Sequence, residues 1–379
     1  MTQVLAGARL FDGTRFHDDH ALVIAGDRIV DLLPVDRAGP PSHVAAGIIA
    51  PGFVDLQVNG GDGLMVDGST DVAALRRICA THRGLGCAGA LPTLITDTPA
   101  ATARVIAAGR QAARQAVPGF LGLHLEGPHL DPRRRGAHDP ALIRPMSDDD
   151  LARLCAAARD LPVLMVTLAP EAARPDQIAA LSAAGVIVSL GHSDCDLDTA
   201  RAAIAAGACA ATHLYNAMSQ LGHRSPGLVG AVLSGPELSA GLIADGVHVH
   251  PAAMQVALAA RPDGLFLVTD CMGFAGTGLT RMTLNGREIR REGGRLTLAD
   301  GTLAGADLRM ADAVARIAAL GATPEAALAM ATRIPARVAG LSASHGALAP
   351  GLSSRIILLD DALALRAVWE DGDWCAPLS

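Results

Sequence analysis

The sequence predicts an α/β fold: a (β/α)₈ TIM-type barrel with a small β-sandwich domain built from both chain termini. Eight short apolar segments between residues 51 and 270 are bounded by Gly, Pro or Asn, as buried strands are. Ala-rich stretches of helical composition, such as residues 71–86 and 198–207, alternate with them, which indicates a parallel sheet. A doubly wound open sheet is the alternative, but no Gly-rich dinucleotide fingerprint accompanies the eight units.

The elements follow one another in a simple order. The small β domain is expected from residues 1–50 and 346–379, because both ends have short strand patterns separated by turns. The barrel is expected over residues 51–345, with a β-hairpin insertion at about 280–304, an Asn285-Gly286 turn signal and a final helix from near Ala306. The eight expected barrel strands are residues 51–60, 87–96, 119–127, 161–170, 185–193, 208–216, 238–246 and 264–270.

Composition excludes several classes of protein. No apolar run approaches the roughly 20 residues that span a bilayer, so we expect a soluble protein with no membrane partner. The N-terminus lacks a basic segment followed by a continuous apolar one, which favours the cytoplasm. A net charge of -7 and only 2% aromatic residues argue against a nucleic-acid partner.

Lysine and cysteine usage narrows the chemistry further. The chain contains no lysine, which excludes Schiff-base chemistry, a P-loop lysine and a carboxylated lysine that bridges two metals. Seven cysteines without a C-x-x-C pair indicate reduced thiols more than a disulfide framework or a thiolate zinc site. Even Cys195 and Cys271, close to candidate site residues, are expected to be packing residues.

The predicted strands end on residues that can carry chemistry. Active sites of such barrels lie at the C-terminal ends of the strands, so polar residues there are more informative than polar residues elsewhere. These strand-end residues are Gln57, Asn59, Thr96, Glu126, Pro170, His192, His213, Asp245 and Asp270.

Three of them form a candidate metal site. Glu126, His192 and His213 end adjoining strands, and two imidazoles with one carboxylate match a catalytic zinc-type site with an open water position. Any one of them alone could be a buried group bonded to backbone. His124, two residues deeper on the same side of its strand, is expected to have a structural role. Asp270 could exchange a proton with a metal-bound water; its alternative role is to cap the next turn.

A set of motifs resembles one family throughout the barrel. The segments PGFVDLQVNG, LPTLIT, HLEGPHL, GHSD, THLYNAM, PGLVGA, IADGVHV, LVTD and TLAG resemble, in this order, the N-acetylglucosamine-6-phosphate deacetylases of the amidohydrolase superfamily. The flanking β segments agree as well. The resemblance implies metal-dependent hydrolysis of the acetamide of N-acetyl-D-glucosamine 6-phosphate to D-glucosamine 6-phosphate and acetate, in amino-sugar catabolism and cell-wall recycling.

The resemblance also implies residue roles at the reacting centre. One divalent metal per subunit would be held by Glu126, His192 and His213, with Zn²⁺ expected and Fe²⁺, Co²⁺ or Mn²⁺ as alternatives. Asp270 would act as general base and then as general acid. His138 would polarise the acetyl carbonyl or bind the sugar.

A second group of residues is implied for the 6-phosphate. His248, Arg224 and the backbone at Asn216 and Ala217 would hold it, and an arginine fork with imidazoles suits phosphate. Alone, Arg224 would be interpreted as a solvated loop residue, and His138 or His248 as a surface histidine. In the family, the arginine matching Arg224 can reach the neighbouring subunit's site, which implies a homodimer.

The sequence departs from common patterns on the first strand. Many amidohydrolases carry H-x-H there and bind a second metal with it, whereas this chain has Gln57 and Asn59. Amides are poor ligands beside imidazole, so a single-metal site is expected, although Gln57 could instead contact the water or the metal indirectly. The run after Asp270 also differs, with Gly273 and Phe274 where Pro-containing versions are commoner, which leaves substrate preference open.

Three other functions remain open from the sequence. A deacetylase of N-acetylgalactosamine 6-phosphate cannot be separated by inspection. Another metal amidohydrolase would keep the metal ligands and Asp270 but have no use for the phosphate-binding set. A non-catalytic barrel would be marked by lost metal ligands, and all three are present here.

Overall fold

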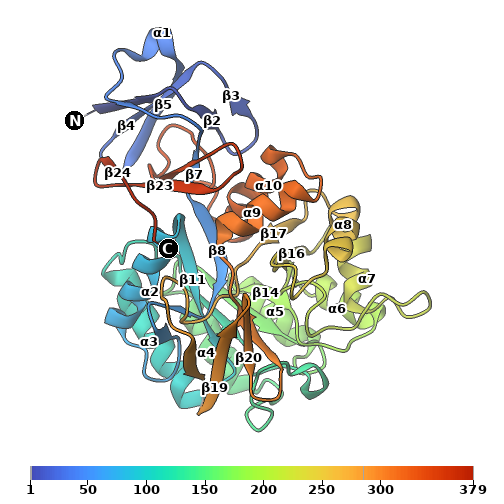
Figure 1. Cartoon of the computed structure of the whole chain (residues 1–379). Helices are drawn as coiled ribbons and strands as arrows, with labels where there is room; N and C mark the ends of the chain where they lie inside the picture. The colour runs from blue at the N-terminus through green and yellow to red at the C-terminus, as the bar shows by residue number, and fades with distance from the viewer. Residues whose placement is uncertain (1, 285, 379) are drawn as a thin grey trace.

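An eight-stranded parallel barrel forms the centre of the computed structural model, which describes residues 2–284 and 286–378 (Figure 1). Consecutive strands pair in parallel around it. The last strand returns to the first, since the Asp270 N–H donates to the Gln57 carbonyl at 3.0 Å. The predicted (β/α)₈ barrel is therefore confirmed. Its strands are β8 (Phe53–Val58), β11 (Cys87–Ile95), β12 (Leu123–Glu126), β13 (Leu164–Leu168), β14 (Ile187–Leu190), β15 (Ala210–Ala211), β16 (Ser239–Leu242) and β17 (Leu265–Leu267).

Helices surround the barrel, and several of them begin where the sequence supplies a side-chain cap. The side chain of Asp71 accepts from the N–H of Ala74 at the start of α2, and Ser147 and Asp150 form a reciprocal capping box on α4. The helices are α2 (Val72–Gly84), α3 (Pro99–Arg114), η1 (Pro132–Arg134, a 3₁₀ turn), α4 (Asp148–Ala158), α5 (Pro175–Ala183), α6 (Leu197–Ala205), α7 (Gly227–Ser234), α8 (Pro251–Ala260), α9 (Met310–Ala319), α10 (Pro324–Ala331) and α11 (Arg333–Val338).

The helix predicted to start near Ala306 begins four residues later. Ala306 still belongs to a strand, and its N–H donates to the Asp270 carbonyl at 2.9 Å. That contact holds residue 306 in extended structure, so α9 starts only at Met310.

The insertion after the last barrel strand is a four-stranded antiparallel sheet rather than one hairpin. Gly293 and Gly294 have φ of 57° and 73°, values that glycine adopts readily, and they add a turn that the sequence reasoning did not use. Asn285 of the predicted turn lies outside the described residues. The strands are β18 (Arg281–Leu284), β19 (Arg287–Glu292), β20 (Arg295–Leu298) and β21 (Leu303–Ala306), labelled in part in Figure 1.

Both chain ends contribute to one sheet beside the barrel. Figure 1 shows blue N-terminal and red C-terminal strands together, and the register pairs Ile357 with Ala50. The domain limits of 1–50 and 346–379 stay a prediction. The sheet orders are β24-β23-β22-β7-β2-β3 and β5-β4-β1-β6. Their strands are β1 (Thr2–Ala6), β2 (Arg9–Phe11), β3 (Phe16–His17), β4 (His20–Ala25), β5 (Arg28–Pro34), β6 (His43–Val44), β7 (Ile48–Pro51), β22 (Ile356–Leu359), β23 (Leu365–Glu370) and β24 (Asp373–Cys375).

Three short elements remain among the described residues: α1 (Val35–Ala38), β9 (Gly60–Gly61) and β10 (Leu64–Met65). Within the described ranges, no helix is long and apolar enough to cross a membrane.

All seven cysteines are free, and burial raises the pKa of Cys195 to about 11 and that of Cys271 well above its usual value. Both thiols therefore stay protonated, as packing residues would.

Candidate active site

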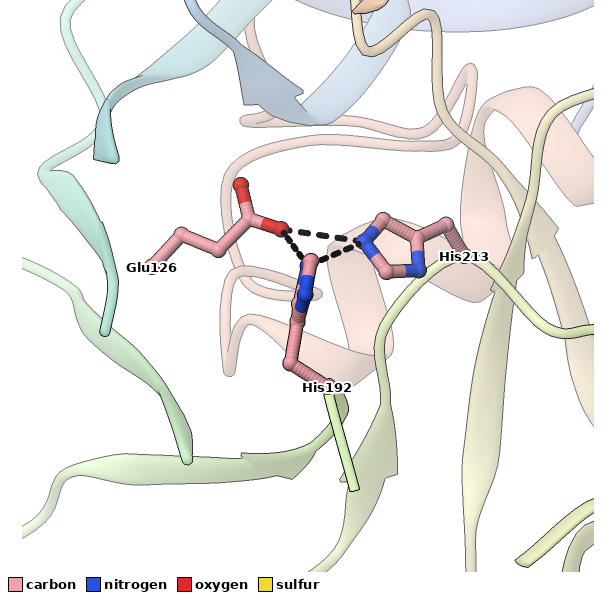
Figure 2. A group of neighbouring side chains, drawn as sticks. All are labelled: Glu126, His192 and His213. Atoms are coloured by element: carbon pink, nitrogen blue, oxygen red, sulfur yellow. Dashed lines mark hydrogen bonds and ion pairs between the residues drawn. The ribbon is translucent and has the colours of Figure 1, made fainter. Parts of the chain in front are cut away.

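Glu126, His192 and His213 converge at the C-terminal end of the barrel (Figure 2). The Nε2 atoms of His192 and His213 lie 3.0 and 2.9 Å from Glu126 Oε1 and 3.1 Å from each other. All three side chains are buried. The strand ends thus bring the three sequence-predicted ligand residues together.

The backbone is strained where it presents these side chains. Glu126 is the last residue of β12, whereas His192 and His213 follow β14 and β15 by two residues, with φ of 48° and 33°. Asp270 also has a φ of 48°. A left-handed conformation costs a non-glycine residue about 1–3 kcal/mol and persists only where the surroundings fix it. Three strained residues at one rim therefore indicate a site that the fold holds in place.

Hydrogen bonding fixes the tautomer of His192. Its Nδ1 donates to the Arg134 carbonyl at 2.8 Å, and burial, then the nearby His138, lowers its pKa to about 4. A neutral ring with its proton on Nδ1 directs a bare Nε2 lone pair at the Glu126 carboxylate. Two such acceptors 3.0 Å apart repel each other, and a cation between them removes the repulsion. The donor set therefore fits a metal ion held by two imidazoles and one carboxylate.

The pKa values of Glu126 and His213 are shifted by their contacts with each other. Burial alone would raise the pKa of Glu126, but its contacts with His138, His192 and His213 outweigh burial and hold the pKa well below its usual value. Burial opposes protonation of His213, yet its hydrogen bond to Glu126 and the charge of Glu126 raise its pKa. The carboxylate is thus ionised and available as a ligand.

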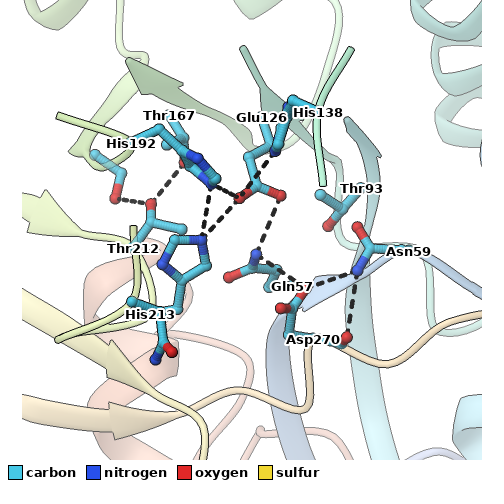
Figure 3. Close-up of polar contacts among 12 residues, drawn as sticks. Gln57, Asn59, Thr93, Glu126, His138, Thr167, His192, Thr212, His213 and Asp270 are labelled. Carbon is cyan, nitrogen blue, oxygen red and sulfur yellow. Dashed lines mark hydrogen bonds and ion pairs between the residues drawn. The ribbon is translucent and has the colours of Figure 1, made fainter. Parts of the chain in front are cut away.

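Asp270 lies opposite the cluster and is held by both first-strand amides (Figure 3). Its Oδ1 accepts from Gln57 Nε2 at 3.1 Å and from Asn59 Nδ2 at 2.7 Å. Over residues 2–284 and 286–378, its Oδ2 accepts no hydrogen bond. Burial, then the charge of Glu126, raises the Asp270 pKa to about 6. The carboxylate therefore has one oxygen occupied and one free, and it is poised to exchange a proton near neutral pH.

Gln57 also connects the two carboxylates. Its Nε2 donates to Glu126 Oε2 at 3.2 Å as well as to Asp270. The two amides therefore contact the carboxylates directly, at the positions where H-x-H would supply ligands for a second metal.

His138 approaches the cluster from the loop after β12. His138 Nδ1 lies 2.7 Å from Thr96 Oγ1 and accepts from the Thr96 N–H at 3.3 Å, so Nδ1 carries a lone pair and a neutral ring has its proton on Nε2. This Nε2 is 3.8 Å from Glu126 Oε1, and His138 lines the same cavity. The ring therefore presents an N–H donor to whatever occupies the site.

The cavity at this rim has a volume of about 250 Å³. Asn216, Ala217 and His248, to which the family resemblance gives a phosphate-binding role, line this cavity, and that role stays a prediction. His248 Nδ1 is 2.6 Å from Asp245 Oδ2, a contact that orients the ring and that sequence reasoning missed. Arg224 lies elsewhere, exposed in the loop before α7. Among the described residues, the wall contains no arginine.

The remaining wall comes from residues without a predicted role. Ile95, Met272, Leu284 and residues 302–305 line the cavity. Leu284 lies in β18 and residues 303–305 lie in β21, both strands of the inserted sheet. Arg287 ties that sheet to the His138 loop by donating to the Ala137 carbonyl at 2.6 Å. The TLAG motif was the available signal for residues 302–305, but nothing in its pattern indicated a cavity wall.

Comparisons with known proteins agree with this geometry. The amidohydrolase family model matches residues 48–374. The N-acetylgalactosamine-6-phosphate deacetylase of Shewanella sp. (strain ANA-3) is 40% identical, covering 88% of this chain and 84% of its own. The human N-acetylglucosamine-6-phosphate deacetylase is 38% identical, covering 86% and 83%. The crystal structure of the enzyme of that name from Pasteurella multocida superimposes with a TM-score of 0.94 at 30% identity, covering 99% and 100%.

Amidohydrolases are metal-dependent, and the buried Glu/His/His cluster described above is the matching feature of this chain. The family model covers the whole barrel, and the two relatives cover 88% and 86% of the chain. The chain therefore belongs to the amidohydrolase family and, within it, to the family of the N-acetylglucosamine-6-phosphate deacetylases.

Proposed function

We propose that this enzyme hydrolyses the acetamide of N-acetyl-D-glucosamine 6-phosphate, releasing D-glucosamine 6-phosphate and acetate. The observation that carries the proposal is the convergence of Glu126, His192 and His213 within one cavity. Asp270 lies opposite them, with its Oδ1 held by hydrogen bonds. The names of the relatives supply the substrate class.

The three converging residues would hold one divalent metal ion per subunit. Imidazole and carboxylate donors suit Zn²⁺, our first choice, and also Fe²⁺, Co²⁺ or Mn²⁺. When bound, the metal would lower the pKa of a water and polarise the acetyl carbonyl. Gln57 and Asn59 occupy the remaining first-strand positions with amides, which supports a single-metal site.

Asp270 would serve as base and then as acid. Its Oδ1 is held by two amide N–H groups, so Oδ2 is the oxygen that would take a proton from the attacking water. The C–O bond to the acetyl carbon forms as that proton moves to Asp270. The same proton then passes to the sugar nitrogen as the C–N bond breaks, so acetic acid and the neutral amine are formed. The remaining proton of the acid passes to the amine or to solvent, which gives acetate.

His138 would stabilise the carbonyl oxygen of the acetamide. Its Nε2–H is free to donate because Nδ1 accepts from the Thr96 N–H. An N–H donor held before the reaction is worth more to a developing oxyanion than one that must reorient.

The 6-phosphate would be held by His248, by backbone at Asn216 and Ala217, and by Arg224 of a second subunit. His248 is oriented by Asp245, but the described wall of the cavity contains no arginine, and Arg224 is exposed on its loop. A homodimer in which this loop enters the partner's cavity would supply the missing cation. A cytoplasmic location and the lack of nucleic-acid and membrane partners stay predictions.

One observation favours a second substrate. The Shewanella relative, at 40% identity, is an N-acetylgalactosamine-6-phosphate deacetylase. The two sugar phosphates differ only in the configuration of one hydroxyl, so the proposed chemistry serves both.

The test is the rate of acetate release from both sugar phosphates and from unphosphorylated N-acetylglucosamine. We expect kcat/KM to be highest for N-acetylglucosamine 6-phosphate. For the unphosphorylated sugar we expect it to be at least about 100-fold lower, because two charge-assisted hydrogen bonds to the phosphate are lost. A higher value for the galacto phosphate would reassign the substrate. Turnover of neither phosphate by metal-loaded protein would point to another amidohydrolase reaction.

A further inference from the structure

A line of buried polar side chains runs across the barrel one layer below the candidate metal ligands. His124, Thr167, Ser189 and Thr212 are each at most 2% exposed. Barrel interiors are filled mainly by branched apolar residues, so a polar layer at this depth calls for a physical reason. We call these four residues the hydroxyl chain; Figure 3 shows Thr167 and Thr212 beside His192 and His213.

Short hydrogen bonds connect every member of the hydroxyl chain. His124 Nε2 is 2.7 Å from Thr167 Oγ1, which is 2.6 Å from Thr212 Oγ1, and this atom is 2.6 Å from Ser189 Oγ. At its other end, His124 Nδ1 donates to the Leu56 carbonyl at 3.1 Å. The chain thus spans strands from β8 to β15.

The direction of these bonds follows from the first one. With Nδ1 donating to Leu56, a neutral His124 accepts at Nε2, so the Thr167 hydroxyl donates to it. Each hydroxyl has one proton, so Thr212 donates to Thr167 and Ser189 donates to Thr212. Removing one hydroxyl therefore leaves neighbours on both sides unpaired, which is costly when they are buried.

The hydroxyl chain contacts the backbone on which the candidate ligands stand. Thr212 directly precedes His213, and Thr167 pairs in register with Glu126. Gly191 directly precedes His192, and a Cβ built on it would lie 3.0 Å from both Thr167 and Thr212. The backbone of each candidate ligand is therefore next to a residue of the hydroxyl chain.

The strained histidines need such support. His192 and His213 have φ of 48° and 33°, a conformation that relaxes unless packing and hydrogen bonds fix it. The hydroxyl chain adjoins the backbone of both residues, since Thr212 directly precedes His213 and Thr167 and Thr212 lie close to Gly191, which directly precedes His192. Burying these polar side chains costs folding free energy. That cost is offset if the hydroxyl chain holds the ligand atoms at their separations of about 3 Å.

We infer that Thr212, Thr167 and His124 are positioning residues that set the geometry and affinity of the metal centre through the backbone of His192 and His213. The inference rests on the proposed metal site. It assigns a function to His124 beyond core packing, and it makes the hydroxyl of Thr212 more important than its methyl group.

The test compares Thr212→Val, which loses the hydroxyl and keeps the shape, with Thr212→Ser, which keeps the hydroxyl. Three quantities are measured on each full-length protein: the Kd for Co²⁺ by chelator competition, the visible absorption spectrum of the Co²⁺ form, and the Tm of the metal-free protein. We expect Thr212→Val to raise the Kd by about 10- to 100-fold and to alter the spectrum, and Thr212→Ser to change neither appreciably.

A different result is expected if the hydroxyl chain only stabilises the fold. Thr212→Val would then lower the Tm while leaving the Co²⁺ Kd and spectrum as in the wild type, and the inference would be wrong. If Thr212→Val does not fold, Thr167→Val and Thr167→Ser make the same comparison. Wild-type protein that binds no Co²⁺ would instead overturn the proposed metal centre itself, so the two failures are distinguishable.

Discussion

The two ends of the cavity are built in different ways. At the metal end, Glu126, His192 and His213 are buried and contact one another within the same chain. At the other end, Asn216, Ala217 and His248 are only partly buried, and Arg224 is exposed away from the wall. The difference teaches that one chain preassembles the chemistry, whereas tight anchoring of an anionic substrate depends on loops and, in our proposal, on a second copy.

Breaking the metal end should have the largest effect. His213→Ala removes one of three ligands, so we expect metal content to fall from about one to near zero per chain and turnover to disappear. Metal analysis by mass spectrometry after dialysis, together with acetate release, checks this. An active His213→Ala protein would show that the cluster is not the catalytic centre.

Asp270→Asn should separate chemistry from binding at the same end. The amide can still occupy the space but cannot take a proton, so kcat should fall by about 10²–10⁴-fold. Metal content should stay near that of the wild type, because Asp270 is not among the proposed ligands. Parallel loss of metal and activity would instead mean that Asp270 helps to hold the ion.

Breaking the phosphate end should raise KM more than it lowers kcat. Arg224→Ala removes a charge-assisted hydrogen bond, so we expect KM for the sugar phosphate to increase about 10- to 100-fold. Turnover of unphosphorylated N-acetylglucosamine should not change, which serves as the internal control.

Mixed dimers sharpen the same point. Subunits carrying Asp270→Asn keep Arg224, and subunits carrying Arg224→Ala keep Asp270, so a mixed dimer contains one complete site if the arginine acts in trans. Equal mixing and reassociation should restore about a quarter of wild-type activity at low substrate concentration. Activity no greater than that of the two variants alone would place Arg224 outside the partner's site.

The smallest predicted effect concerns the pH dependence of Asp270. The base must be ionised, so kcat/KM should fall as the pH drops through the Asp270 pKa, which burial raises to about 6 in the metal-free chain. Asn59→Leu removes a hydrogen bond to the ionised form. The acid limb should then move to higher pH, by about half to one unit. A limb that stays in place would show that Asn59 does not tune this carboxylate.

The sequence predicted the metal end better than the phosphate end for a physical reason. Glu126 ends its strand, and His192 and His213 follow the ends of theirs by two residues. Parallel strands of a barrel all end at one rim, so the pattern of strands already brings the three residues together. Arg224 stands on a loop whose course no periodicity determines. Only the resemblance to a family gave it a role, and this chain alone leaves it exposed.

Contacts between distant loops could not be predicted either. Thr96 and His138 are 42 residues apart, and the backbone N–H that sets the His138 tautomer has no signature in the sequence. The inserted sheet was expected as one hairpin, because its second turn depends on the left-handed conformation of Gly293 and Gly294 rather than on the strand pattern. Both features follow from how loops pack, which residue spacing does not encode.

The most direct test of the central claim is acetate release from N-acetylglucosamine 6-phosphate by metal-stripped protein as Zn²⁺ is returned in known amounts. The account predicts no acetate before addition and a linear recovery that ends at about one Zn²⁺ per chain, since residues 2–284 and 286–378 contain one set of three ligands. Full activity of the stripped protein, or no acetate once one equivalent is bound, would contradict it.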